Sequence, residues 1–271
     1  MPSAQHLRAQ IEANLAARIP SALTPLPRVP SPAAPTGIRE IDALLHGGFP
    51  VGALSEIVGP ECSGRTSLAL AFVAGMTQEG KVCAWVDVSD TLHPESAAAL
   101  GVDLSRLLWI RCGVPPGTAP LRKLWSRLEQ GLKVSDLLLQ AGGFSCIVLD
   151  LGSLPAEYAL RVPLATWFRF RAAAERLQAN VLLLTQHACS RNSAGLVLRL
   201  NPGNVLNHDS TIFTGLEHKA ELTRQRFPQD KVLPLRSTAG PTASRGGRDR
   251  KQPQNVQTAA WQARTVWAGP R

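Results

Sequence analysis

Eight consecutive residues have the composition and spacing of a loop that binds phosphate. They are Gly59, Pro60, Glu61, Cys62, Ser63, Gly64, Arg65 and Thr66. Glycines at this spacing let consecutive backbone N–H groups curve around an anion, and a helix that begins at the loop adds the partial positive charge of its N-terminus. The segment therefore predicts a nucleotide-binding loop that continues into Ser67, with the Thr66 hydroxyl as a ligand for Mg²⁺.

One residue of this loop departs from the usual pattern. Arg65 stands where such loops carry a lysine that reaches the β and γ phosphates. Arginine is longer, planar and forked, so it can bind a phosphate through two hydrogen bonds but can also crowd the γ position. A glycine-rich turn between a strand and a helix can also be purely structural. The loop taken alone leaves both interpretations open.

The elements that must position the loop follow from the apolar pattern. Short apolar runs predict strands and longer stretches with helical spacing predict helices. The predicted strands are 54–58, 82–88, 107–111, 146–149, 181–184, 196–200 and 220–227, and the predicted helices include 67–76 and 167–177. A polar loop is expected over 201–209. Strands that alternate with helices predict an α/β fold in which a mainly parallel sheet is covered by helices on both faces.

Two polar residues stand at the ends of predicted strands. Asp150 closes the apolar run 146–149, and Gln186 follows the run 181–184. A carboxylate at the end of a buried strand suits Mg²⁺, which is held in part through water. Each residue can also be a simple polar strand terminus. A functional role requires that both side chains lie beside the phosphate loop in the folded protein.

The order of these features resembles the core of the RecA family. The matching residues are Thr36-Gly37, Ile41-Asp42, 44–48, Glu56-Ile57, Gly59-Pro60-Glu61, Val86-Asp87, Leu92, Pro94, 100–103 and Leu107-Leu108. The resemblance runs from about residue 36 to 190, with a weaker likeness to 227. It implies a RecA-like fold, ATP and Mg²⁺ as ligands, Asp150 as the Walker B aspartate and Gln186 as the residue that senses the γ phosphate.

The same resemblance exposes a second departure. In active RecA proteins a glutamate just past the second strand activates the attacking water, and Ser89 occupies that position here. Asp90 is adjacent and is a candidate substitute, although its side chain is shorter. Loss of both the lysine and the glutamate predicts that ATP hydrolysis is weak or absent.

These losses make the chain similar to the ImuA group of RecA-related proteins, which accompany translesion polymerases in damage-induced (SOS) mutagenesis. The resemblance implies RecA or translesion polymerases as partners. One alternative is an active DNA-dependent ATPase of the recombinase type, with Asp90 or Glu61 activating water. Another is a scaffold or inhibitor of RecA filaments that needs no nucleotide.

Charge and composition favour a polyanionic partner. The net charge is +9, although seven basic residues and one acid, Asp249, lie from Arg236 onward. Single-stranded DNA is the expected partner, and Arg161, Arg191 and Arg199 follow the strands whose loops bind DNA in RecA proteins. Solvated surface arginines are the alternative. With no apolar stretch of membrane length, a cytoplasmic protein without membrane contact is expected.

The chain divides into four predicted parts. Residues 1–19 form an amphipathic helix, 20–35 a proline-rich linker, 36–233 the RecA-like core, and 234–271 a basic, disordered tail. The apolar stripe of the first helix suits packing on its own core or self-association with a second copy. Trp261, Arg264 and Trp267 in the tail suit a motif that anchors on a partner.

Overall fold

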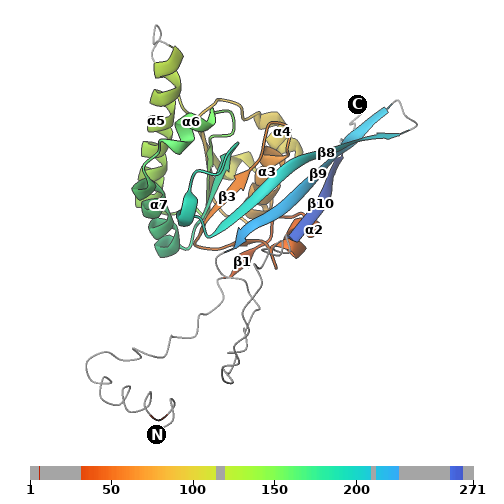
Figure 1. Ribbon diagram of the computed structural model, residues 1–271, viewed down its shortest axis with the longest axis horizontal. Coiled ribbons are helices and arrows are strands. Elements are labelled where there is room, and N and C mark those ends of the chain that lie inside the picture. The colour runs from red at the N-terminus through yellow and green to blue at the C-terminus, as the bar shows by residue number, and fades with distance from the viewer. Residues whose placement is uncertain (1–5, 7–31, 114–119, 209–211, 226–256, 265–271) are drawn as a thin grey trace, which may run out of the picture. The chain divides into compact units, whose positions relative to one another are not determined.

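The computed structural model describes residues 6, 32–113, 120–208, 212–225 and 257–264 (Figure 1). The predicted helix 1–19 apart from His6, most of the linker 20–35 and most of the tail 234–271 lie outside these residues. The elements are β1 (Ala33–Ala34), α2 (Arg39–Leu44), β2 (Phe49–Pro50), β3 (Leu54–Val58), α3 (Arg65–Gln78), β4 (Cys83–Asp87), α4 (Pro94–Ala99), η1 (Leu104–Arg106), β5 (Leu107–Arg111), α5 (Pro120–Ala141), β6 (Cys146–Asp150), α6 (Ala156–Leu160), α7 (Leu164–Leu177), β7 (Asn180–Thr185), η2 (Arg191–Ser193), β8 (Leu196–His208), β9 (Ile212–Gln225) and β10 (Gln257–Arg264).

An eight-stranded sheet organises the described part of the chain. Its order is β10-β9-β8-β3-β7-β6-β4-β5. The six strands from β8 to β5 are parallel to their neighbours, while β9 and β10 are antiparallel additions at one edge. The predicted α/β class with a mainly parallel sheet is confirmed. The carboxyl ends of β3, β6 and β7 lie side by side, so the segments that follow these strands meet at one edge of the sheet.

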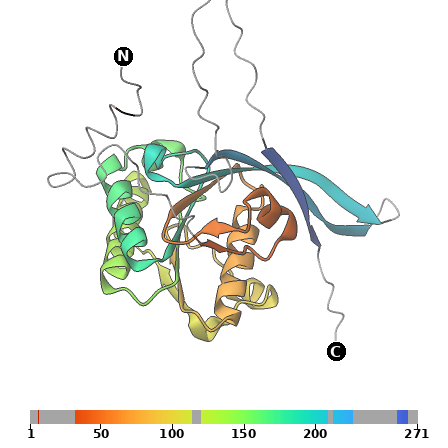
Figure 2. The ribbon, with the colours of Figure 1, turned by 90° about the horizontal axis from the view of Figure 1, so that it is seen from below.

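The strands are apolar on both faces because helices cover both faces. Side chains alternate along each strand: Trp85 and Val148 pack in the cluster that contains Phe72 of α3. Val86 and Leu149 pack in the cluster on the other face, which contains residues of α5, α6 and α7 (Figure 2). Burial on both faces explains why these strands appear in the sequence as continuous apolar runs.

The edge of the sheet differs from the prediction. The polar loop expected over 201–209 is wrong for residues up to His208, because β8 runs on as a strand of 13 residues and forms a long hairpin with β9 (Figure 1). The pairing is irregular between Pro202 and Val205, and a Cβ atom on Gly203 would lie 2.4 Å from the Glu217 carbonyl oxygen. Glycine is therefore required where the two backbones approach.

The predicted tail also contains a strand. Residues 257–264 form β10, so the expectation of disorder is wrong for this segment. β10 lacks an apolar run, but Trp261 is only 4% exposed and Ala259 packs beside it in the core. The prediction that Trp261 anchors on a partner does not agree with this position in the core of its own chain, and Trp267 lies outside the described residues. At the other end of the core, the last residues of the predicted linker form β1, which pairs with β2.

Candidate nucleotide-binding site

The predicted phosphate loop connects β3 to α3, as the sequence indicates. Cys62 and Gly64 both have left-handed backbone conformations, with φ angles of 60° and 88°. The backbone N–H of Gly59 donates to the carbonyl oxygen of Thr185 at 3.1 Å, which fixes the loop to the end of β7. A Cβ atom on Gly59 would lie 2.4 Å from the Leu200 carbonyl oxygen. Gly64 is thus required by its left-handed backbone conformation, and Gly59 by the close approach of the Leu200 backbone.

Ser63 gives the loop a polar group without a protein partner. Its side chain is 1% exposed, and among the described residues its Oγ atom has no hydrogen-bond partner. An unmade hydrogen bond on a buried hydroxyl is unfavourable by about 1–3 kcal/mol, so an ordered water or a ligand is expected to supply the partner. Glu61, Cys62 and Thr66 of the same loop are exposed. This arrangement suits an anion seated against the loop.

Arg65 is the first residue of α3, and its side chain turns into the protein. The residue is 9% exposed, and its Nη2 atom donates to the carbonyl oxygen of Gly152 at 3.0 Å. The Nη1 atom is buried without a partner among the described residues. Burial lowers the pKa of Arg65, while the charges of Asp150 and Glu61 oppose that shift. The guanidinium therefore sits at the end of β6.

Asp150 and Gln186 converge on the same point. The Gly152 N–H donates to Asp150 Oδ1 at 2.9 Å, and Gln186 Nε2 donates to the Gly152 carbonyl oxygen at 3.0 Å. Burial raises the pKa of Asp150 to about 6, against the opposing effects of the Gly152 N–H and the Arg65 charge. The structure thus brings the phosphate loop, Asp150 and Gln186 together around Gly152. No motif in the sequence pointed to that glycine.

The raised pKa of Asp150 predicts a pH-dependent difference between Asp150→Asn and the natural protein. The carboxyl binds its proton more tightly in the folded state, so its contribution to stability is fully present below its unfolded pKa, near 4, and is lost as pH rises through about 6. From pH 4.5 to 7.5 the natural protein should lose about 2 kcal/mol relative to Asp150→Asn. Urea unfolding of both proteins at the two pH values measures this, and a constant difference would contradict the assignment.

The residues at the expected position of the water-activating base are poorly suited to that task. Ser89 has no basic group, and its buried Oγ atom has no partner among the described residues. Asp90 accepts two hydrogen bonds from Arg111, from Nε at 2.6 Å and from Nη2 at 2.8 Å. Its hydrogen bond with Arg111 lowers the pKa of Asp90. A paired carboxylate with a low pKa is a weak base.

His218 is a residue of the site that the sequence did not reveal. It lies on β9 and is 3% exposed, and its ring packs so closely on the loop that a Cβ atom on Gly64 would lie 2.9 Å from its Cγ and Nδ1 atoms. The Trp261 ring of β10 covers it, with the ring centroids 5.0 Å apart. Burial lowers the pKa of His218. His218 lies just before the segment predicted as the last strand, which is why no pattern pointed to it.

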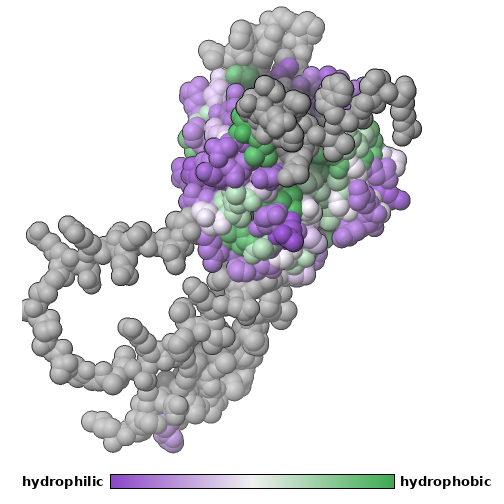
Figure 3. All heavy atoms as spheres, turned by 90° about the vertical axis from the view of Figure 1, so that its right-hand side faces the viewer, coloured by the Kyte–Doolittle hydropathy of each residue, from purple (hydrophilic) through white to green (hydrophobic). Residues whose placement is uncertain are grey.

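The three candidate DNA-binding arginines lie on separate segments. Arg161 follows α6, Arg191 is in η2 and Arg199 is in β8, and all three are exposed. Of these, Arg199 is in register with Val58, the last residue of β3 before the phosphate loop. Figure 3 shows hydrophilic and hydrophobic residues interspersed over the described surface on the hairpin side of the molecule. The assignment of these arginines to DNA stays a prediction.

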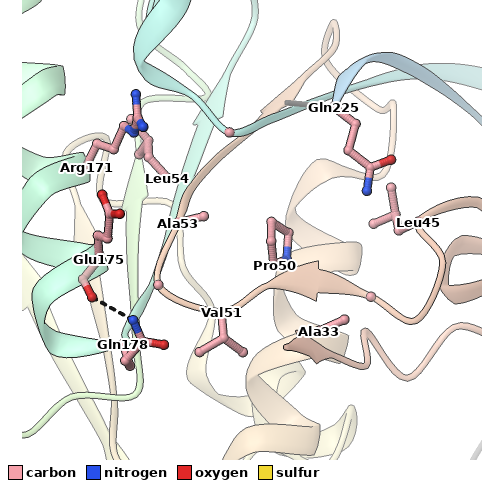
Figure 4. Close-up of a pocket in the computed structure, with 13 residues that line it drawn as sticks. Ala33, Leu45, Pro50, Val51, Ala53, Leu54, Arg171, Glu175, Gln178 and Gln225 are labelled. Atoms are coloured by element: carbon pink, nitrogen blue, oxygen red, sulfur yellow. Dashed lines mark hydrogen bonds between the residues drawn. The ribbon is translucent and has the colours of Figure 1, made fainter. Parts of the chain in front are cut away.

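A separate small cavity lies at the opposite end of β3 (Figure 4). Its volume is about 140 Å³, and it is lined by residues 50–54, which precede or begin β3, together with Arg171, Glu175 and Gln178. Gln178 Nε2 donates to the Glu175 carbonyl oxygen at 2.7 Å. Because the phosphate loop follows the other end of β3, this cavity is not part of the candidate site.

Part of the chain is similar to known proteins. Residues 28–157 match the RecA N-terminal domain family. Protein RecA of Frankia alni is 39% identical over 124 residues, which are 45% of this chain and 32% of that protein. Over these residues the chain is similar to RecA proteins. The crystal structure of the RadB recombinase matches with a TM-score of 0.51 and 22% identity over 72% of this chain and 90% of that one, which shows a shared fold.

These matches cover the RecA-like core unevenly. The chain spans about a third of the length of the curated RecA relative. The family match ends at residue 157, so it includes the phosphate loop, Ser89 and Asp150 but not Gln186 or the strands from β7 to β10. None of the described helices is long and apolar enough to cross a membrane. The five cysteines are all free thiols, and only Cys62 is exposed.

Proposed function

We propose that this chain is a RecA-like DNA repair protein whose phosphate loop binds ATP without efficient hydrolysis and which acts through DNA and protein partners. The observation that carries the proposal is the position of Arg65. One nitrogen of its guanidinium, Nη2, is bound to the Gly152 carbonyl oxygen near Asp150. The rest of the loop keeps the glycines, and the Ser63 hydroxyl has no partner among the described residues; both features favour phosphate.

Weak hydrolysis follows from the groups near the loop. Phosphoryl transfer to water needs positive charge on the transferred phosphate and a residue that orients the water. Arg65 already donates to a protein carbonyl, Ser89 cannot act as a base, and Asp90 is paired with Arg111. The recombinase-type ATPase is therefore the less favoured alternative.

We further propose that the partners are those of damage-induced mutagenesis: single-stranded DNA, RecA and translesion polymerases. Support comes from the likeness of residues 28–157 to the RecA N-terminal domain combined with the altered residues Arg65 and Ser89. An accessory protein of this kind needs a RecA-like surface for its partners more than it needs repeated ATP hydrolysis. A damage-induced mutation assay with Gly64→Ala would separate this role from a scaffold that needs no nucleotide, since only the scaffold would keep full function.

The proposal predicts binding without turnover. The natural protein should bind ATP but release no phosphate above background, with or without single-stranded DNA. Arg65→Lys combined with Ser89→Glu should restore the missing groups and increase phosphate release about tenfold or more, a modest share of what a positioned base contributes. Filter binding and a phosphate-release assay measure the two steps.

The matched control is Arg65→Lys combined with Ser89→Gln, which has a similar size but supplies no base. It should bind ATP and remain inactive. Robust hydrolysis by the natural protein would show that the arrangement of Arg65 and Ser89 is compatible with catalysis and would support an active DNA-dependent ATPase instead.

A further inference from the structure

The RecA-like fold implies Mg²⁺ at the phosphate loop, and the residues present allow a test of whether that ion fits. The groups expected to hold it are the Thr66 hydroxyl and the Asp150 carboxylate. Thr66 is exposed, whereas Asp150 is 4% exposed and adjoins the guanidinium of Arg65. The carboxylate that would neutralise a divalent cation therefore already faces a fixed positive charge.

Gly152 shows how closely the two charges approach. A Cβ atom on this glycine would lie 3.0 Å from Asp150 Oδ1 and 3.3 Å from Arg65 Nη1, so both atoms border the same small space. The space exists because residue 152 has no side chain. Asp150 Oδ1 also accepts the N–H of Gly152. A divalent cation at Asp150 would be repelled by Arg65, and this repulsion is strong where water is excluded.

The guanidinium is held in this position by its neighbours. Arg65 begins α3, directly after the left-handed Gly64, and its Nη2 atom shares the Gly152 carbonyl oxygen with Gln186. These contacts tie two separate segments of the site, α3 and the residues after β7, to one backbone group. Mg²⁺ requires near-ideal octahedral geometry with oxygen ligands, and the guanidinium of Arg65 lies near the carboxylate that would be one of them. Mg²⁺ therefore does not fit the residues as they stand.

The same residues do fit an anion. Arg65 Nη1 and Ser63 Oγ are both buried, and neither has a hydrogen-bond partner among the described residues. Both lie on the phosphate loop, and both can donate to an oxygen. Guanidinium groups bind phosphate oxygens well because the charge and the forked donors match them.

We propose that this loop binds the phosphate groups of a nucleotide without a divalent metal, with Arg65 as the cation of the site. The inference rests on the proposed nucleotide binding and adds that the ligand is the metal-free nucleotide. Free ADP or ATP is then preferred over its Mg²⁺ complex, because the metal lowers the negative charge that Arg65 attracts.

Titration calorimetry with ADP tests this in a buffer with EDTA and in one with excess Mg²⁺. The natural protein should bind ADP in EDTA, and excess Mg²⁺ should weaken binding by about twofold or more. Arg65→Lys removes the forked cation and supplies the usual residue, so Mg²⁺ should strengthen its binding of ADP about tenfold. The matched control Arg39→Lys changes an exposed arginine and should behave as the natural protein does.

A second readout follows the metal itself. The electron paramagnetic resonance signal of Mn²⁺ should remain that of the free ion when the natural protein and ADP are added, and should diminish with Arg65→Lys and ADP. Mn²⁺ bound by the natural protein, or ADP binding that EDTA abolishes and Mg²⁺ restores, would overturn this inference and leave the proposed function intact. Failure of the folded natural protein to bind ADP in either buffer would overturn both.

Discussion

Replacing Gly64 by alanine is expected to reduce ADP affinity at least about 100-fold, because the phosphate loop cannot keep its shape. Gly64 has a φ angle of 88°, which an L-residue adopts at a cost of about 1–2 kcal/mol. The new Cβ atom would also lie 2.9 Å from two atoms of the buried His218 ring. The loop must move away from β9, and its N–H groups then no longer converge on one anion. Titration calorimetry with ADP measures the loss.

Gly75 provides the matched control within the same helix. It lies in α3, and a Cβ atom placed on it meets nothing within 4 Å. Gly75→Ala should therefore stabilise the protein by about 0.5–1 kcal/mol and leave ADP binding unchanged. Combining Gly64→Ala with His218→Ala should recover part of the lost affinity, since the clash is removed while the backbone strain remains. Normal ADP binding by Gly64→Ala alone would be incompatible with the loop described here.

Replacing Glu56 by alanine is expected to destabilise the fold by about 1–3 kcal/mol for each donor that it leaves buried without a partner. Glu56 lies in β3, just before the phosphate loop, and is fully buried. Its carboxylate accepts the Cys189 N–H at 2.7 Å and also bonds the N–H and hydroxyl of Ser190. Alanine would leave these donors buried without partners and would detach β3 from the segment after β7. Urea unfolding followed by tryptophan fluorescence measures the effect.

Two variants show whether this stabilisation arises from the buried contacts. Glu56→Gln keeps one acceptor oxygen and should lose less stability than Glu56→Ala. Glu79→Ala removes an exposed carboxylate that pairs with Lys81 at 2.7 Å, and should change stability by less than about 1 kcal/mol. Equal effects of Glu56→Ala and Glu79→Ala would mean that the Glu56 contacts contribute little.

The parallel part of the fold was predictable because buried strands leave a plain mark in the sequence. The predicted strands 54–58 and 107–111 have the same bounds as β3 and β5. The edge was harder, since β8 and β9 pair over polar residues and β10 is defined only by its pairing with a partner distant in the chain. No local pattern encodes such a pairing.

The candidate site divides in the same way. Arg65 and Ser89 stood out from the sequence because their neighbours match a known motif. The position of the Arg65 guanidinium could not be predicted from the sequence, because it depends on the absence of a side chain at Gly152. The pairing of Asp90 with Arg111 likewise depends on the contact between β4 and β5. The sequence motifs thus located the site. The pairing of charges within it depends on residues that become neighbours only in the folded structure.

The position of β10 gives the two walls of the phosphate loop different local stabilities. β3 and β7 lie inside the sheet and pair with a strand on each side, whereas the Trp261 ring that covers His218 belongs to β10 at the edge of the sheet. An edge strand that pairs with a single neighbouring strand is where local unfolding begins. Backbone amide exchange should therefore be faster along β10 than in β3, although both strands border the same site.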